Sequence, residues 1–307
     1  MIHVLFISDD TSGQLNKNFY FLEQELSKGI NLTVWRKPGH ISYILKQLPS
    51  RPDFILLLND MEHHLSPLIK GLAHTDIPTG LFINDIHRLT KLRKNYIEKN
   101  KIDYLFTAVR DTFTATYPEF AAKMEWLPHF VNTNLYKDYG LTKEIDLLMM
   151  GAVNAIYPLR QTIRNAYKDD SHFVYHSHPG YRKFTETEGK QQMIGQTYAE
   201  ELNRARIFFT SPSILHYPVI KYFEALACRT LLLAPTFKEL EDLGFVPDFH
   251  FVPINEHNFK EKAAYYLAHE TERQKIADQG YRFIHATHTL QKRTEQLIKR
   301  IKQIAEK

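Results

Sequence analysis

Short apolar runs recur along the first half of the chain, and stretches of mixed polarity separate them. Such runs are typical of strands buried on both faces of a parallel sheet. Several of the stretches between them carry apolar residues at helical spacing. This alternation predicts a doubly wound α/β domain. The expected strands lie at 3–8, 31–35, 53–59, 79–84 and 104–108, and expected helices include 18–28, 43–48 and 65–73.

After an irregular segment at 127–140, the alternation starts again. Strands are expected at 145–150, 172–176, 206–210, 230–234 and 250–254, and one or two helices are expected from 271 to the end. The fold class is therefore α/β, with two tandem Rossmann-like domains at 1–135 and 141–307. We expect the two domains to face each other across a cleft and the C-terminal helix to pack back.

The segment 206–234 predicts a strand, a loop, a helix and a second strand. Pro218 fits the first turn of the helix, because proline has no N–H to lose there. In a parallel sheet, the loop after a strand and the start of the next helix face the ligand. Free N–H groups at that helix start suit a phosphate. The loop offers Ser213, His216 and Tyr217.

Lys221 and Glu224 are polar positions on this otherwise apolar helix. They are three residues apart and therefore share one face. One interpretation places the Glu224 carboxylate against the ribose of a nucleotide whose diphosphate lies at the helix start. The alternative is a solvated ion pair on a surface helix.

Composition limits the function classes. The chain has 307 residues, a net charge of +4 and one cysteine. This weak basic excess does not favour nucleic acid as a partner. Cys228 has no second cysteine for an internal disulfide, which favours a reducing, cytoplasmic setting. The first residues already predict a strand, so we expect no signal peptide, and no apolar run reaches the roughly 18–20 residues of a membrane span.

Three segments resemble a known family. Residues 215–228 read Leu-His-Tyr-Pro-Val-Ile-Lys-Tyr-Phe-Glu-Ala-Leu-Ala-Cys, and 198–208 and 279–289 are also similar. They resemble GT-B glycosyltransferases, in particular the spore-maturation CgeB and YkvP-like branch. The resemblance implies transfer of a sugar from a nucleotide-diphosphate sugar, a UDP-sugar above all, to a glycan or other acceptor. It also implies retention at the anomeric carbon. We expect the donor to be held mainly by the second domain, the acceptor to meet the first, and neither a metal nor another cofactor to be required.

The resemblance assigns donor-binding roles in the second domain. Related retaining enzymes carry Glu-x7-Glu, whose second glutamate holds the ribose and corresponds to Glu224. The first glutamate is replaced by His216 here. Arg160 is the expected clamp for the diphosphate, with Lys221 as the second cation. The alternative for Arg160 is a surface position on its helix. The expected donor site also includes Tyr217, Pro218 and Val219 at the helix start, Ser213, and Asn154 after the strand at 145–150.

Two loops offer further contacts. His178 and Tyr181 follow the strand at 172–176, where Tyr181 could stack on a base or could belong to a plain turn. Gly13, after the first strand, lets backbone approach a ligand or simply makes the turn.

His87 and Asp85 follow the strand at 79–84. His87 resembles the histidine that many of these enzymes place near the transferred sugar, and Asp85 could orient it or act as a base, so the two are the expected catalytic residues. His87 could also be structural, and Asp85 could be the N-cap of the next helix. The basic run 88–101 could contact an anionic acceptor or membrane surface, or it could be a solvated helix face.

Other chemistries find little support. No Gly-x-Gly-x-x-Gly follows the first strand, and no Walker loop, HExxH or Gly-x-Ser-x-Gly is present. Two alternatives to a transferase stay open. One is a sugar-nucleotide epimerase of the same fold, and the other is a non-catalytic nucleotide- or sugar-binding protein of the spore-coat type.

Overall fold

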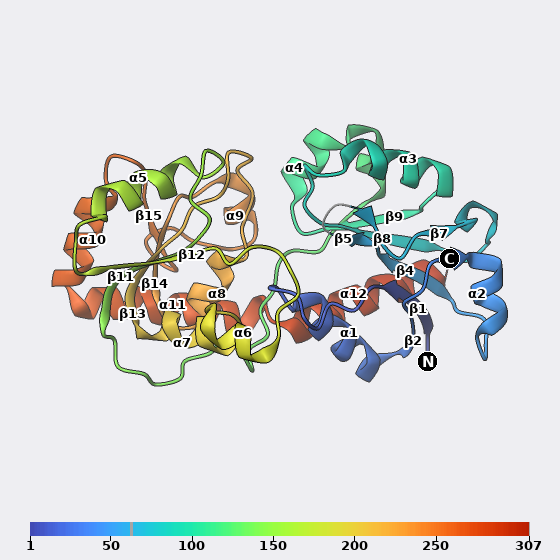
Figure 1. The fold of residues 1–307 in the computed structure, drawn as a ribbon, viewed down its shortest axis with the longest axis horizontal. Coiled ribbons are helices and arrows are strands. Elements are labelled where there is room, and N and C mark those ends of the chain that lie inside the picture. The colour runs from blue at the N-terminus through green and yellow to red at the C-terminus, as the bar shows by residue number, and fades with distance from the viewer. Residues whose placement is uncertain (62–63, 307) are drawn as a thin grey trace. The chain divides into compact units, whose positions relative to one another are not determined.

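The computed structural model describes residues 1–61 and 64–306. The chain divides into two compact units (Figure 1). The first contains Met1–Ser12, Phe19–Pro128 and Gln291–Lys307, and the second contains Gly13–Asn18 and His129–Leu290. The sequence predicted domains at 1–135 and 141–307. The structure instead groups the last helix with the first unit and residues 13–18 with the second.

In the described residues, a six-stranded sheet forms the core of the first unit, in the order β10-β9-β8-β4-β1-β2. All its pairings are parallel. Strands β1, β4 and β8 are buried along their whole length, as expected for apolar runs covered on both faces. The strands are β1 (His3–Ser8), β2 (Asn31–Trp35), β4 (Phe54–Leu58), β8 (Thr79–Ile83), β9 (Tyr104–Thr107) and β10 (Met124–Trp126).

Helices and short strands complete the first unit. The helices are α1 (Asn18–Gly29), α2 (Ile41–Gln47), α3 (Thr90–Asn100), α4 (Arg110–Thr116), η2 (Pro118–Lys123) and α12 (Leu290–Ala305). The short strand β3 (Gly39–His40) pairs with β7 (Ile69–Lys70), and β5 (Asp60–Met61) pairs with β6 (His64–Leu65).

The prediction of a helix at 65–73 is wrong. The segment forms β6, β7 and the 3-10 helix η1 (Leu72–His74). Pro67 removes a backbone donor, and Gly71 adopts a φ of 80°, which is left-handed backbone. These two residues stop the helix that the apolar spacing suggested.

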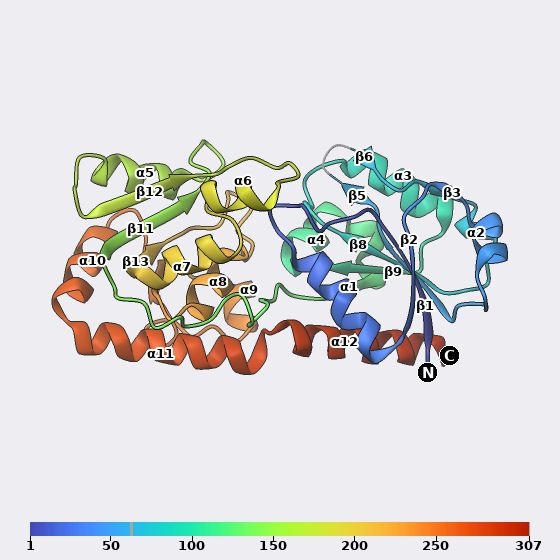
Figure 2. The same ribbon diagram turned by 60° about the horizontal axis from the view of Figure 1, so that its bottom comes forward.

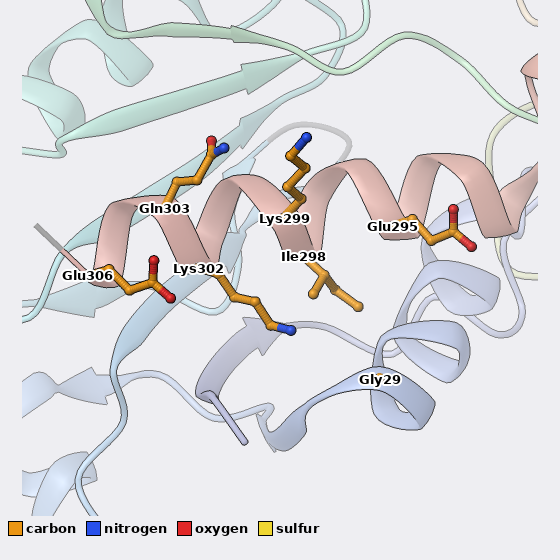
Figure 3. A pocket seen from close by; sticks show the side chains of 7 residues that line it. All are labelled: Gly29, Glu295, Ile298, Lys299, Lys302, Gln303 and Glu306. Carbon is orange, nitrogen blue, oxygen red and sulfur yellow. The ribbon is translucent and has the colours of Figure 1, made fainter.

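The terminal helix α12 packs beside α1 (Figure 2). Ile298 points from α12 toward Gly29, where a methyl group would lie only 2.8 Å from the Ile298 Cδ1 (Figure 3). Arg300 donates to the Glu125 carboxylate at 2.5 Å, and Gln296 donates to the Trp126 carbonyl at 3.2 Å. These contacts explain why the end of the chain belongs to the first unit.

A second parallel sheet forms the core of the second unit, in the order β12-β11-β13-β14-β15. Strands β13 and β14 lie inside it and are almost wholly buried. The strands are β11 (Ile145–Gly151), β12 (Phe173–Ser177), β13 (Ala205–Phe209), β14 (Leu231–Ala234) and β15 (Val252–Pro253).

The helices of the second unit pack around this sheet and around an aromatic cluster that includes Tyr222, Phe223, Phe245 and Phe251. They are α5 (Pro158–Tyr167), α6 (Glu186–Gln191), α7 (Gln196–Arg204), α8 (Lys221–Ala227), α9 (Lys238–Asp242), α10 (Phe259–Ala268) and α11 (Glu270–Thr287). Among the described residues, no helix is both long enough and apolar enough to span a membrane.

Candidate functional site

The carboxyl edge of the second sheet gathers most of the expected donor residues. Strand β11 ends at Gly151, β12 at Ser177 and β13 at Phe209. Because these strands are parallel, the loops that follow them leave the sheet at the same edge. The neighbouring helices α5 and α8 supply Arg160 and Lys221.

Arg160 is the third residue of helix α5 and is held firmly at this edge. It is only 3% exposed, its Nη2 donates to the Ser211 carbonyl at 2.6 Å, and its Nη1 lies 3.4 Å from the Ala152 carbonyl. The guanidinium carbon lies 3.9 Å from the centre of the Tyr157 ring. Burial lowers the pKa of Arg160 from its usual value, although the group stays charged. The alternative of a surface position is therefore wrong.

Lys221 lies beside Arg160. Burial lowers the pKa of Lys221 to about 8; Glu224 opposes this shift and Arg160 adds to it. A Cβ placed on Gly151 would lie 3.0 Å from Lys221 Cε and 3.3 Å from Arg160 Nη1. The end of β11 thus lies in direct contact with both cations.

His178 adds a third basic group. Burial lowers its pKa, and the nearby charges of Lys221 and Arg160 lower it further, so the neutral form of His178 is favoured beside the two cations. Its Nδ1 accepts from the Gly180 N–H at 2.9 Å, and its ring lies 4.6 Å from that of Tyr181. Tyr181 is 67% exposed, so one face remains accessible.

Glu224 is turned into the protein. It is 6% exposed, and the hydroxyls of Tyr136 and Tyr198 are close enough to its carboxylate to lower its pKa by hydrogen bonding. Burial raises the pKa of Glu224, and Lys221 and the two hydroxyls oppose this rise. The alternative of a solvated ion pair with Lys221 is therefore wrong. The ribose-binding role of Glu224 stays a prediction.

The loop before α8 is longer than the sequence suggested. The helix begins at Lys221, so Pro218 and Val219 precede it and do not form its first turn. The loop bends at His216, which has a φ of 51° and donates its N–H to the Ser213 carbonyl at 3.0 Å. Ser213 is buried and its hydroxyl accepts from the Leu215 N–H at 3.2 Å. Tyr217 lies half-buried between these residues and α8.

Asn154 and Gly13, two other residues of the expected donor site, make local hydrogen bonds that support loops of the second unit. The Asn154 side chain accepts from the Ile156 N–H at 3.0 Å, which forms the turn after β11. The Gly13 carbonyl accepts from the Phe184 N–H at 2.8 Å within the second unit. Their expected contacts with a ligand remain predictions.

In the first unit, Asp85 and His87 follow β8, and both are exposed. Asp85 has a φ of 30°, and its carboxylate lies 3.8 Å from Arg88. The residue before α3 is Leu89, so Asp85 is not the N-cap that the sequence allowed. In α3 itself, Arg93 is fully buried and donates to the Tyr117 hydroxyl at 2.5 Å. The basic run is thus only partly a solvated face.

Sequence reasoning missed three residues of this region. Gly151 directly follows the strand expected at 145–150, and only its φ of 129° marks it as special. Tyr136 lies in the irregular segment before β11 and Tyr198 lies in α7. Both are distant from Glu224 in the sequence. No local motif connects them.

Comparisons with known proteins agree with this architecture. Residues 154–299 match a family model described as "Glycosyl transferase-like". No curated protein sequence shows significant similarity to the chain. The fold is that of GT-B glycosyltransferases, and the family match, which runs from the second unit into α12, supports a transferase.

Three solved structures illustrate the shared fold. A sucrose-phosphate synthase of Thermosynechococcus elongatus aligns with a TM-score of 0.68 at 11% identity, and the alignment covers 99% of each chain. HepE of Anabaena, in complex with UDP-glucose, has a TM-score of 0.67 at 9% identity, covering 99% of this chain and 100% of that one. A glycosyltransferase of Rickettsia africae has a TM-score of 0.61 at 9% identity, covering 99% and 98%.

Proposed function

We propose that this chain is a glycosyltransferase that binds a nucleotide-diphosphate sugar in its second unit and transfers the sugar to an acceptor. The observation that carries the proposal is the group of Arg160, Lys221 and His178 around the end of β11. A Cβ on Gly151 would lie 3.0 Å from Lys221 Cε and 3.3 Å from Arg160 Nη1, and both cations lower the pKa of His178. This clustering at the carboxyl edge of a parallel sheet supports a site for an anion.

A diphosphate suits this group. Arg160 presents a planar fork of donors and Lys221 a compact ammonium, and both are common phosphate ligands. When the sugar leaves, negative charge develops on the diphosphate. Fixed cations that are already partly desolvated stabilise that charge without having to reorganise. The two residues would therefore contribute to both donor binding and departure of the leaving group.

The remaining donor contacts are assigned by position. Tyr181 has an accessible ring for the base, Ser213 and His216 lie in the loop before α8, and Glu224 would receive the ribose hydroxyls. UDP is the first nucleotide to test, because HepE, which shares the fold, was solved with UDP-glucose. We assign the acceptor, a glycan or similar hydroxyl compound, to the first unit at Asp85 and His87.

Two finer features of the reaction belong to the proposal. We propose retention of configuration, which the sequence resemblance to the CgeB branch implies. For metal independence, we assign the neutralisation of the diphosphate to Arg160 and Lys221, which are basic groups of the chain itself. Addition and chelation of Mg²⁺ should then leave turnover unchanged.

Calorimetry with UDP, GDP and ADP tests donor binding directly. We expect at least one of them to bind the wild-type chain, and Arg160→Ala to lose most of that affinity. Incubation with UDP-sugars and a panel of acceptors then tests transfer. Absence of binding by every nucleotide would contradict the proposal. Conversion of the UDP-sugar to an isomer without an acceptor would indicate the epimerase, and binding without turnover would indicate a non-catalytic protein.

A further inference from the structure

A chain of hydrogen bonds connects Lys221 to Glu224 through Tyr198. The Lys221 ammonium donates to the Tyr198 hydroxyl oxygen at 3.2 Å. On its other side, the Tyr198 hydroxyl lowers the pKa of Glu224 by hydrogen bonding, and the Tyr136 hydroxyl does the same. Each group uses the role that its chemistry allows, since an ammonium only donates and an ionised carboxylate only accepts.

Burial fixes the direction of these bonds. Glu224 is 6% exposed, and Tyr136 and Tyr198 are each 8% exposed. A carboxylate buried to this extent needs donors, because an unpaired buried charge is strongly unfavourable. The Tyr198 hydroxyl therefore directs its proton to Glu224, and its oxygen lone pairs can accept a hydrogen bond from Lys221. The ammonium also lies 4.8 Å from the centre of the Tyr198 ring.

We propose that Tyr198 is a positioning residue that holds the Lys221 ammonium at the diphosphate site, with Glu224 and Tyr136 fixing its hydroxyl. This inference rests on the proposed function, which assigns the diphosphate to Arg160 and Lys221. Tyr198 acts through Lys221 and has no contact with the nucleotide itself. Its role differs from that of a stacking or sugar-binding tyrosine.

Four ionisable groups face Lys221, and they determine how binding depends on pH. They are Tyr198 on α7, Glu224 on α8, Arg160 on α5 and His178 after β12. Arg160 keeps its charge throughout the accessible range. Burial lowers the pKa of His178 and raises that of Tyr198, so neither ionises between pH 7 and 9.5. Glu224 and the uracil ring of UDP can also titrate as the pH rises, so Lys221→Met serves as the reference. The part of the decline in affinity that Lys221→Met lacks reports deprotonation of Lys221.

Calorimetry of UDP binding to the full chain from pH 7 to 9.5 tests the inference. Tyr198→Phe removes the acceptor for Lys221 and one donor to Glu224, and both changes disfavour the ammonium. We expect affinity at pH 7.5 to fall about tenfold, the scale of one hydrogen bond to a charged group. The pH at which affinity declines should also move downward, a change that a purely structural defect would not produce.

A double-variant cycle isolates the route through Lys221. If Tyr198 acts only by positioning the ammonium, Tyr198→Phe with Lys221→Met binds UDP as weakly as Lys221→Met alone. A further tenfold loss in the double variant would overturn the inference, as would wild-type affinity in Tyr198→Phe. Tyr265→Phe is the matched control, because it also removes a tyrosine hydroxyl bonded to a glutamate, Glu272, and should leave UDP affinity unchanged.

Two further measurements cover the remaining outcomes. If Tyr198→Phe does not fold, Tyr136→Phe removes the other donor to Glu224 and should shift the pH profile in the same direction by less. If the wild-type chain binds none of UDP, GDP, ADP and inorganic pyrophosphate, the proposed function fails. Competitive acetylation of the ligand-free chain, read by mass spectrometry, then still tests the contact. An unchanged titration of Lys221 in Tyr198→Phe would overturn it.

Discussion

The Arg160 side chain donates through Nη2 to the backbone carbonyl of Ser211, at a distance of 2.6 Å. This bond ties helix α5 to the loop after β13, so the guanidinium is oriented before any ligand arrives. The Tyr157 ring packs against it from one side. Such an arrangement reduces the ordering cost of binding an anion, because the side chain has few other conformations left.

We expect Arg160→Ala to weaken UDP binding by roughly 10- to 100-fold, the scale of 1.5–3 kcal/mol for hydrogen bonds to a charged group. Arg160→Lys should recover only part of the affinity, because an ammonium lacks the planar fork. Arg164→Ala, on an exposed position of the same helix, is the control and should bind normally. Equal affinities for Arg160→Ala and Arg164→Ala by calorimetry would remove Arg160 from the site.

Gly151 provides a prediction that depends only on the three-dimensional structure. Its φ of 129° is unfavourable for any side chain, and a methyl group there would lie 3.0 Å from Lys221 Cε. We expect Gly151→Ala to lower the free energy of unfolding by about 1–3 kcal/mol, the cost of such strained backbone. It should also displace Lys221 and weaken UDP binding. Gly140→Ala also has a positive φ but no atom within 4 Å, so it should cost stability without affecting binding.

Lys221 should stabilise the nucleotide-bound chain but lower the unfolding free energy of the ligand-free chain. Burial lowers its pKa to about 8, below the value near 10.4 of an unfolded lysine. The charged form therefore opposes folding below pH 8, and this penalty disappears as the pH rises from about 8 toward 10.4. The shift already includes the attraction to Glu224. We expect Lys221→Met to raise the unfolding free energy by about 1 kcal/mol at pH 7 and by less near pH 10.

Denaturant titrations of both proteins at the two pH values measure this difference. Burial also lowers the pKa of Lys143 to about 8, but Lys143 is present in both proteins and its contribution cancels. A stability loss at pH 7 in Lys221→Met would show that packing around its stem outweighs the charge.

Much of the fold could be predicted from the sequence because its strands are short, apolar and buried on both faces. The expected strands at 3–8 and 79–84, for example, correspond to β1 and β8. The prediction of a helix at 65–73 was wrong, because apolar spacing does not reveal the left-handed backbone at Gly71. Pro218 similarly suggested a helix start that the structure places at Lys221.

The candidate site was predictable in part, for a different reason. Arg160 and Lys221 lie next to strands that a parallel sheet must align, so topology alone brings them to one edge. The tyrosines could not be found this way. Tyr136 precedes β11 and Tyr198 lies on α7, and only the packing of these segments against α8 brings their hydroxyls to Glu224.

Glu224→Ala should affect stability as well as binding. If Glu224 receives the ribose, its loss should weaken nucleotide binding by roughly 1–3 kcal/mol. The substitution also leaves the buried hydroxyls of Tyr136 and Tyr198 without their acceptor, which should cost a similar amount of unfolding free energy. Calorimetry and denaturant titration of the same variant separate the two effects. Normal UDP affinity combined with lower stability would leave Glu224 with a structural role only.

His87 should matter for turnover and not for donor binding. It is exposed after β8 in the first unit, where we place the acceptor, whereas the donor residues lie in the second unit. We expect His87→Ala to lower kcat for UDP release from UDP-glucose by at least tenfold, within the usual range for a group that transfers a proton or positions a hydroxyl. The Kd for UDP should stay within twofold. His74→Ala removes another exposed histidine of the same unit and should change neither value. If His87→Ala and His74→Ala turn over at the same rate, the acceptor site must be sought elsewhere in the first unit.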